Sequence, residues 1–386
     1  MSIGKTYSTQ YSDLLSQINN VNVDVAPSKY EVIDKLDIFK LVHYFPLTEK
    51  KYSTPILIVC SFINRPYVLD LHEDISVIQK YLKAGFDVYS VDWGYPTHAD
   101  KFLDLDDYVD FIDRCVSEVQ HRNSVSKVTL HGYCLGGTLT TVYAALYGRN
   151  VKNLILQAAP IDFDTTNTVA LWAKTLDPAK IVDIYHVMPG EFLNVGFLLL
   201  DPLNLLLGKY ENLLDMISSE GIASFLRMEQ WIFDSPSVPG EAFQQFIKQW
   251  YQDNLIIKGK FEVLGQNVDL KDINVPVLVL AARFDHIVPP SSQKAIINLI
   301  SSKDKDVFEI DKGHIGLTTS KDCHRRFWPK VVEWIQHRSE PLEDSQKAKS
   351  EHVSLPVSKK PSRKSTSSSS SVKAQKSKTD PRKRAR

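Results

Sequence analysis

The residues with the clearest potential for covalent chemistry lie around Cys134, in the run Lys127-Val-Thr-Leu-His-Gly-Tyr-Cys-Leu-Gly-Gly-Thr138. Gly132 and Gly136 stand two residues before and after it, as in the G-x-S-x-G nucleophile elbow with cysteine in place of serine. In that motif the nucleophile occupies a strained turn from a strand into a helix. The flanking residues are small because strand and helix pass close together. The helix N-terminus then stabilises negative charge that forms beside the nucleophile.

Two residues suited to acid–base chemistry follow Cys134 in the order acid, then histidine. Asp285 comes shortly after the apolar run 275–282, and His314 follows the next apolar run inside Gly313-His314-Ile-Gly316. This is the chain order in which enzymes with a nucleophile elbow carry their triad. In such a triad His314 takes the proton of the thiol. Asp285 holds the imidazole in the correct tautomer and stabilises its charge.

Other interpretations of these residues remain open at this point. A G-x-C-x-G pattern alone is also compatible with a small buried cysteine. Asp285 has the position of a helix N-cap or turn aspartate, and His314 that of a satisfied loop histidine. Asp162 follows an earlier strand and is an alternative acid. We expect the side chain of His286 to point away from the site, and His131 to be structural.

Apolar runs that resemble strands alternate with amphipathic segments along most of the chain. The predicted strands are 55–62, 86–93, 127–131, 151–159, 275–282 and 307–310, and the predicted helices are 70–83, 105–121, 135–147, 290–301 and 325–337. Continuous apolar strands separated by helices are typical of a parallel sheet that is covered on both faces. Because Cys134 follows the third of these strands, the sequence predicts an α/β-hydrolase fold, with a mostly parallel sheet covered by helices.

The alternation stops between residues 160 and 270, a stretch rich in aromatic residues. We interpret it as an inserted, largely helical cap over the carboxyl edge of the sheet, where active sites of such folds lie. The predicted organisation is an N-terminal segment 1–24, a core 25–159 and 271–340, a cap 160–270 and a tail 341–386. A cap in this position excludes water from the site.

The neutral total charge conceals a strongly basic end. The segment 341–386 holds 13 Lys and Arg against 4 Asp and Glu, a net charge of +9, so residues 1–340 carry −9. This Ser/Lys-rich segment has no aromatic residue, and we expect it to be disordered. It serves either as a solubilising tail or as an electrostatic tether to nucleic acid or an acidic partner.

The remaining composition narrows the class of protein. The four cysteines are far apart and form no C-x-x-C pair, which argues against a disulfide framework and a structural metal site. Residues 1–20 lack the apolar core of a signal peptide. The apolar stretch 192–207 is short and interrupted by polar residues, so it is not a membrane span. We expect a cytoplasmic protein with reduced thiols and no metal.

Six motifs give the chain a specific resemblance that covers roughly residues 25–338. It resembles the polyhydroxyalkanoate synthases, and most of all the catalytic subunit of the class III enzymes. The motifs are INRPYVLDL at 63–71, VDWGYP at 91–96, GYCLGG at 132–137, FLRMEQWIFDSP at 225–236, DHIVPP at 285–290 and GHIG at 313–316. The resemblance implies that Cys134 is the nucleophile, Asp285 the acid and His314 the base.

The resemblance also implies an activity and partners. The expected enzyme polymerises (R)-3-hydroxyacyl-CoA, of short chain such as 3-hydroxybutyryl-CoA, into polyhydroxyalkanoate through an acyl-cysteine, with release of CoA and without a cofactor. The oxyanion is expected to bind the backbone N–H of Leu135 and one near Phe62 or Ile63, for which we take Ile63. A homodimer, a second non-catalytic subunit and association with cytoplasmic polyester granules are expected, and acidic granule proteins are candidate partners of the tail.

Three other functions are compatible with parts of the sequence. A cysteine hydrolase of the dienelactone hydrolase kind shares a similar elbow but lacks a large aromatic cap. An inactive granule-binding scaffold does not require an intact Cys134, Asp285 and His314. Nucleic-acid binding depends only on the basic tail. Cysteine favours acyl transfer, because an acyl-cysteine keeps the thioester energy that ester formation requires, and because a thiolate is the better nucleophile.

Overall fold

The computed structural model describes residues 23–200, Leu203 and residues 219–342. The described residues belong to one compact unit that ends at Leu342. Most of the predicted N-terminal segment 1–24 and nearly all of the predicted tail 341–386 lie outside the described residues.

An eight-stranded sheet forms the centre of this unit, in the order β1-β2-β4-β3-β5-β6-β11-β12. The six strands from β4 to β12 in this order run parallel. All six strands predicted from apolar runs are present, and each is almost entirely buried except β12. The strands are β1 Tyr30–Leu36, β2 Phe39–Tyr44, β3 Ile56–Val59, β4 Val88–Asp92, β5 Val128–Tyr133, β6 Val151–Gln157, β11 Val277–Ala282 and β12 Lys305–Ile310.

The two strands at one edge of the sheet, β1 and β2, were not predicted from the sequence. Strand β1 pairs antiparallel with β2, and β2 pairs antiparallel with β4. Strand β1 is exposed or only half-buried along its length, so it lacks the continuous apolar run that marks a buried parallel strand. Cys134 therefore follows the fifth strand in chain order and not the third.

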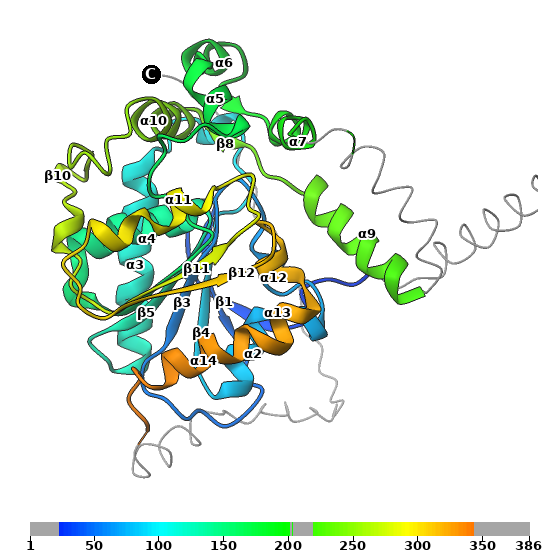
Figure 1. Cartoon of the computed structure of the whole chain (residues 1–386), viewed down its shortest axis with the longest axis vertical. Coiled ribbons are helices and arrows are strands. Elements are labelled where there is room, and N and C mark those ends of the chain that lie inside the picture. The colour runs from blue at the N-terminus through cyan, green and yellow to red at the C-terminus, as the bar shows by residue number, and fades with distance from the viewer. Residues whose placement is uncertain (1–22, 201–202, 204–218, 343–386) are drawn as a thin grey trace, which may run out of the picture. The chain divides into compact units, whose positions relative to one another are not determined.

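Helices cover both faces of the sheet (Figure 1). Helices α2 and α14 contact each other on one face, and α3 and α4 contact each other on the opposite face. The predicted helix over 70–83 begins only at Val77, because the Ser76 hydroxyl caps it by accepting a hydrogen bond from the Gln79 N–H. The helices of the core are α2 Val77–Ala84, α3 Leu105–Asn123, α4 Leu135–Tyr147, α11 Pro290–Lys294, α12 Gly316–Thr319, α13 Lys321–Arg326 and α14 Trp328–Gln336.

The segment between β6 and β11 is mostly helical where the structure describes it. Its elements are α5 Thr168–Thr175, α6 Pro178–Tyr185, β7 Val187–Met188, α7 Gly190–Leu198, α9 Ser219–Phe233, β8 Val238–Pro239, α10 Gly240–Gln245, a π-helical turn Phe246–Gln252, β9 Glu262–Val263 and β10 Gln266–Asn267. Helices α5, α6, α7 and α10 lie together at the top of Figure 1. Within the described ranges, no helix has the length and apolar character needed to cross a membrane.

Candidate active site

Cys134 lies in a sharp turn between strand β5 and helix α4. Its backbone has φ 52° and ψ −128°, a conformation that residues other than glycine rarely adopt. The Cys134 N–H donates to the Gln157 carbonyl at 3.0 Å, and the Cys134 carbonyl accepts from the Gly137 N–H at 2.8 Å. These bonds hold the strained turn in place, and the side chain stands at the N-terminal end of α4.

The two glycines of the motif have no room for a side chain. A Cβ on Gly136 would lie 2.1 Å from the Val59 carbonyl oxygen, and one on Gly132 would lie 2.4 Å from the Gly137 Cα. Both distances are far inside van der Waals contact, and the opposing atoms belong to the backbone. Glycine at these positions is therefore required by the close approach of α4 to β3 and β5.

We expect Gly136→Ala to lower the free energy of unfolding by several kcal/mol and to abolish activity, because overpacking a dense core forces the backbone to move. Gly148→Ala is the matched control, since a Cβ there meets only the Asp272 carbonyl oxygen at 4.0 Å. Urea unfolding of both variants measures the difference. Equal stability of the two variants would contradict the steric account of the elbow.

Asp285 and His314 lie at the ends of the neighbouring strands β11 and β12. The carboxylate Oδ2 of Asp285 is 2.7 Å from His314 Nδ1, and both side chains are buried. Asp285 Oδ1 accepts from the backbone N–H groups of Ile287 at 2.9 Å and Val288 at 2.8 Å. The carboxylate is thus held rigidly through Oδ1, while Oδ2 orients the imidazole.

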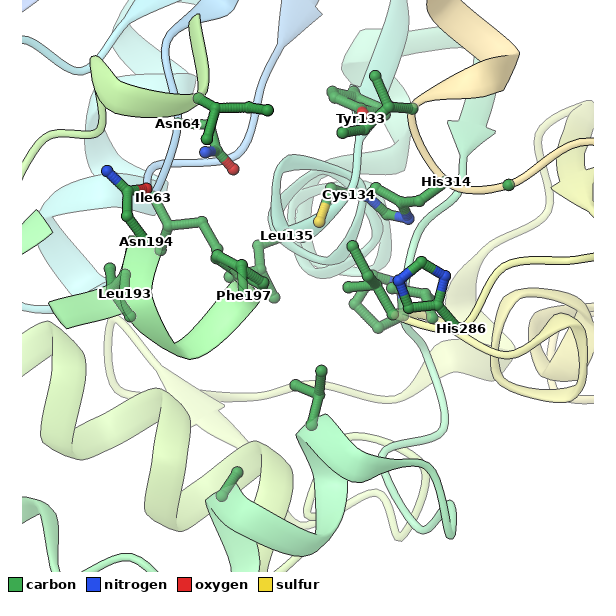
Figure 2. Close-up of a pocket in the computed structure, with 18 of the residues that line it drawn as sticks. Ile63, Asn64, Tyr133, Cys134, Leu135, Leu193, Asn194, Phe197, His286 and His314 are labelled. Atoms are coloured by element: carbon green, nitrogen blue, oxygen red, sulfur yellow. The ribbon is translucent and has the colours of Figure 1, made fainter. Parts of the chain in front are cut away.

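The pKa of His314 depends on its burial and on its neighbours Asp285 and Cys134. Burial alone would lower the pKa of His314, but the charges of Asp285 and Cys134, with hydrogen bonds to both, raise that pKa well above its usual value. Figure 2 shows the Cys134 sulfur beside the His314 ring. With Nδ1 bonded to Asp285, the other ring nitrogen is left to exchange a proton with the thiol. This arrangement supports proton transfer between sulfur and imidazole.

A cavity of about 400 Å³ opens onto the side chains of Cys134 and His314. Its walls come from both the core and the inserted helices, and most of the side chains that line it are apolar. They include Ile63, Tyr133, Cys134, Leu135, Val169, Leu193, Phe197, Trp231, Phe246, Tyr251, Ile287, His314 and Ile315. Asn64 and Asn194 lie across the cavity from Cys134 in Figure 2. The site therefore suits an acyl group with a few polar atoms.

The two predicted oxyanion donors belong to residues that line this cavity. Leu135 is the first residue of α4, so its N–H has no partner within the helix. The N–H of Ile63 makes a long contact of 3.5 Å with Ser61 Oγ. Both N–H groups are candidates for binding an oxyanion, and their role stays a prediction.

The other acidic and histidine residues considered for the site differ in whether they line the cavity. Asp162 accepts from Asn254 at 2.8 Å and is not among the residues that line the cavity. His131 is fully buried between Tyr81 and Gln157, and burial lowers its pKa to about 4, as suits a neutral structural histidine. His286, which we expected to point elsewhere, lines the same cavity as Cys134.

Sequence reasoning missed two buried glutamines that hold the site together. Gln293 donates to Asp285 Oδ2 at 3.0 Å, and it lies on helix α11, which begins at Pro290. The side-chain amide of Gln157 donates to Thr318 Oγ1 at 2.7 Å, while the backbone carbonyl of Gln157 accepts from the Cys134 N–H. Neither has a distinguishing sequence signal, because buried glutamines are recognised only by their partners.

The cysteines and acidic groups of the described chain give no sign of a metal site or disulfide. All four cysteines are free and buried. Within the described residues, no cluster of three or more His, Cys, Asp or Glu has the arrangement of a metal site. Burial raises the pKa of the thiol of Cys60, which directly follows β3, so that thiol stays protonated.

Two family models match the sequence. The α/β-hydrolase fold model matches residues 54–320, and the model of the poly-beta-hydroxybutyrate polymerase (PhaC) N-terminus matches residues 8–82. The first agrees with the mostly parallel sheet and its covering helices, so the predicted fold is confirmed.

The related sequences carry the same name, PhaC, as the second family model. The poly(3-hydroxyalkanoate) polymerase subunit PhaC of Haloferax mediterranei is 41% identical over 85% of this chain and 68% of its own length. The PhaC subunit of Allochromatium vinosum is 43% identical over 74% of this chain and 81% of its own. The PhaC subunit of Synechocystis sp. is 37% identical over 84% of this chain and 88% of its own.

Solved structures resemble the fold at low sequence identity. MenH from S. aureus superposes with a TM-score of 0.52 at 18% identity, covering 78% of this chain and 99% of its own. DcsB in complex with its substrate analogue superposes with a TM-score of 0.50 at 19% identity, covering 80% and 98%. Likeness at this level shows a shared fold.

Proposed function

Because this chain belongs to the family of poly(3-hydroxyalkanoate) polymerase PhaC subunits, and is thus an acyltransferase that polymerises hydroxyalkanoates, we propose how it does so. Cys134 takes the acyl group of (R)-3-hydroxyacyl-CoA as a thioester, and CoA leaves. The growing polyester is extended from that acyl-cysteine. The observation that carries the proposal is the Asp285–His314 contact of 2.7 Å, together with the cavity that both His314 and Cys134 line.

The first half-reaction moves the acyl group from one sulfur to another. His314 accepts the proton of the Cys134 thiol, and the sulfur attacks the thioester carbonyl. The oxyanion that forms is placed against the N–H groups of Leu135 and Ile63, each of which contributes about 3 kcal/mol in a typical oxyanion hole. The carbon–sulfur bond to CoA then breaks, and His314 returns the proton to the leaving thiolate.

The second half-reaction forms the ester bond. The hydroxyl of a further (R)-3-hydroxyacyl-CoA gives its proton to His314 and attacks the acyl carbonyl on Cys134. The bond between that carbon and the Cys134 sulfur breaks, and the thiolate recovers the proton from His314. The lengthened chain is then a CoA thioester, which acylates Cys134 again by the first half-reaction and releases CoA. Water must stay out, since it would use the same acyl-enzyme for hydrolysis. The apolar walls contributed by α5, α7 and α9 support this exclusion.

Incubation with (R)-3-hydroxybutyryl-CoA tests the function directly, with free CoA and insoluble polymer followed together. The proposal expects CoA release that is matched by polymer. CoA release with only soluble 3-hydroxybutyrate would favour the hydrolase alternative, and no CoA release would contradict the choice of substrate. The preference for short chains is proposed from the family resemblance, and a comparison of initial rates with 3-hydroxyoctanoyl-CoA tests it.

Partners beyond the substrate are also proposed from the family. We propose a homodimer, stimulation by a second non-catalytic subunit and residence on cytoplasmic polyester granules. Full specific activity from a demonstrably monomeric preparation would contradict the first two.

For the basic tail 341–386 we propose a salt-sensitive tether to nucleic acid or to acidic granule proteins. Its deletion should leave CoA release unchanged and alter where the protein is found in the cell.

A further inference from the structure

One aspartate at the end of helix α9 binds two tyrosines of the core. Asp234 Oδ2 accepts the hydroxyl of Tyr67 at 2.9 Å, and Asp234 Oδ1 accepts the hydroxyl of Tyr95 at 2.7 Å. Tyr67 follows β3 and Tyr95 follows β4, so the carboxylate joins two loops at the edge of the sheet to the inserted helices. We call these three residues the clasp.

Further contacts reinforce the clasp on the core side. Arg65 forms a two-point ion pair with Asp92, at 2.8 and 3.0 Å, and its guanidinium lies 4.2 Å from the centre of the Tyr95 ring. The Arg65 carbonyl accepts the indole N–H of Trp231 at 2.9 Å. Loop 63–67 is therefore fixed both to β4 and to α9.

The clasp lies directly behind one wall of the cavity. Ile63 and Asn64 line the cavity from the core loop, and Trp231 and Ile232 line it from α9. Ser235, next to Asp234 in the chain, also lies between the two asparagines of this wall. Its hydroxyl is 3.4 Å from Asn64 Nδ2 and donates to Asn194 Oδ1 at 2.7 Å.

We propose that Asp234 is a positioning residue for acyl transfer. Through its hydrogen bonds to Tyr67 and Tyr95, it holds the backbone N–H of Ile63 and the wall formed by α9 at fixed positions relative to Cys134. The inference rests on the proposed function, since it assigns a purpose to the Ile63 N–H. An error of about 1 Å in such a group can lower a rate about 10²-fold. A clasp of two directed hydrogen bonds is suited to prevent such an error.

The protonation states of the clasp suit permanent bonding. Burial, followed by the hydrogen bond to Asp234, raises the pKa of Tyr95 to about 12, and the same causes raise the pKa of Tyr67 further. Both hydroxyls therefore stay protonated near neutral pH and can donate to the Asp234 carboxylate.

The test uses tyrosine-to-phenylalanine variants of the full-length protein, which remove a hydroxyl and keep the ring. They are Tyr67→Phe, Tyr95→Phe and the double variant, with Asp234→Asn as a second means of weakening the clasp. Tyr143→Phe is the matched control, because its hydroxyl also donates to an aspartate, Asp113, at 2.8 Å, between α3 and α4. Thermal unfolding is the check that each variant is folded.

Two reactions of Cys134 separate positioning from general damage. Acylation by (R)-3-hydroxybutyryl-CoA or by 4-nitrophenyl butanoate needs the oxyanion donors, whereas alkylation by iodoacetamide does not. We expect the double variant and Asp234→Asn to lose about tenfold or more in acylation rate with both acyl donors, because a displaced donor no longer stabilises the oxyanion. Alkylation should change by less than about twofold, since the thiol and His314 are untouched.

Each result decides the inference. Unchanged acylation in the double variant, or equal losses in acylation and alkylation, would overturn it. Because two acyl donors are used, this test of the clasp does not depend on (R)-3-hydroxybutyryl-CoA being the natural substrate. If the wild-type protein is acylated by 4-nitrophenyl butanoate but not by the CoA thioester, the proposed substrate is wrong, and the clasp is judged on the ester alone.

Discussion

Cys134→Ala is expected to abolish both CoA release and polymer formation while the protein stays folded. Removing the nucleophile of such a triad lowers turnover by about 10⁴-fold or more. The side chain belongs to a strained turn whose backbone bonds to Gln157 and Gly137 do not depend on it. The measurement is initial CoA release at saturating substrate, with circular dichroism and thermal unfolding as the check on folding.

Cys134→Ser is the matched variant for the choice of sulfur. Its hydroxyl occupies nearly the same place, but it is the weaker nucleophile and its acyl-enzyme is an ordinary ester that has lost the thioester energy. We expect little or no polymer from it. Polymer formation by Cys134→Ala at a rate near that of the wild type would exclude Cys134 as the nucleophile.

Asp285→Asn is expected to lower turnover by about 10²-fold or more and to lower the pKa of His314. The charge of Asp285 is a principal cause that raises this pKa against the opposing effect of burial. Removing that charge therefore shifts the loss of the imidazole proton to lower pH. The residual rate should exceed that of His314→Gln, because a group that orients the base contributes less than the base itself.

Histidine-labelled protein allows this shift to be measured without turnover, by following the His314 resonance through a pH titration. Cys134→Ala removes a second cause that raises the pKa and should also move the titration to lower pH. Asp162→Asn is the control, since Asp162 hydrogen-bonds to Asn254 and is not among the residues lining the cavity. An unchanged titration in Asp285→Asn would contradict the electrostatic coupling of the pair.

The central strands and the relative order of the candidate site residues could be predicted from the sequence, for physical reasons. Buried parallel strands need continuous apolar runs, and a nucleophile elbow needs tiny residues beside Cys134, so both leave a signal in the chain. The structure places Asp285 and His314 in contact, and Cys134 lines the cavity beside His314. This proximity follows from the fact that loops after neighbouring parallel strands meet at one edge of a sheet.

Features that depend on partners far apart in the sequence could not be predicted. Asp234 is 139 residues from Tyr95 and 167 from Tyr67, and the motif at 225–236 that contains it does not show that these two tyrosines are its partners. Strand β1 was missed because a half-exposed antiparallel edge strand carries no continuous apolar run. His286 was expected to face away, but the turn after Asp285 brings it to the cavity.

The covalent intermediate on Cys134 is the central claim, and peptide mass spectrometry tests it most directly. Trypsin cleavage after Lys127 and Arg149 releases a peptide in which Cys134 is the sole cysteine. Protein quenched in acid during turnover of (R)-3-hydroxybutyryl-CoA should carry one or more hydroxybutyryl units on that peptide, removable by hydroxylamine as a thioester is. Polymer accumulating while this peptide stays unmodified, or while another residue carries the chain, would contradict the account.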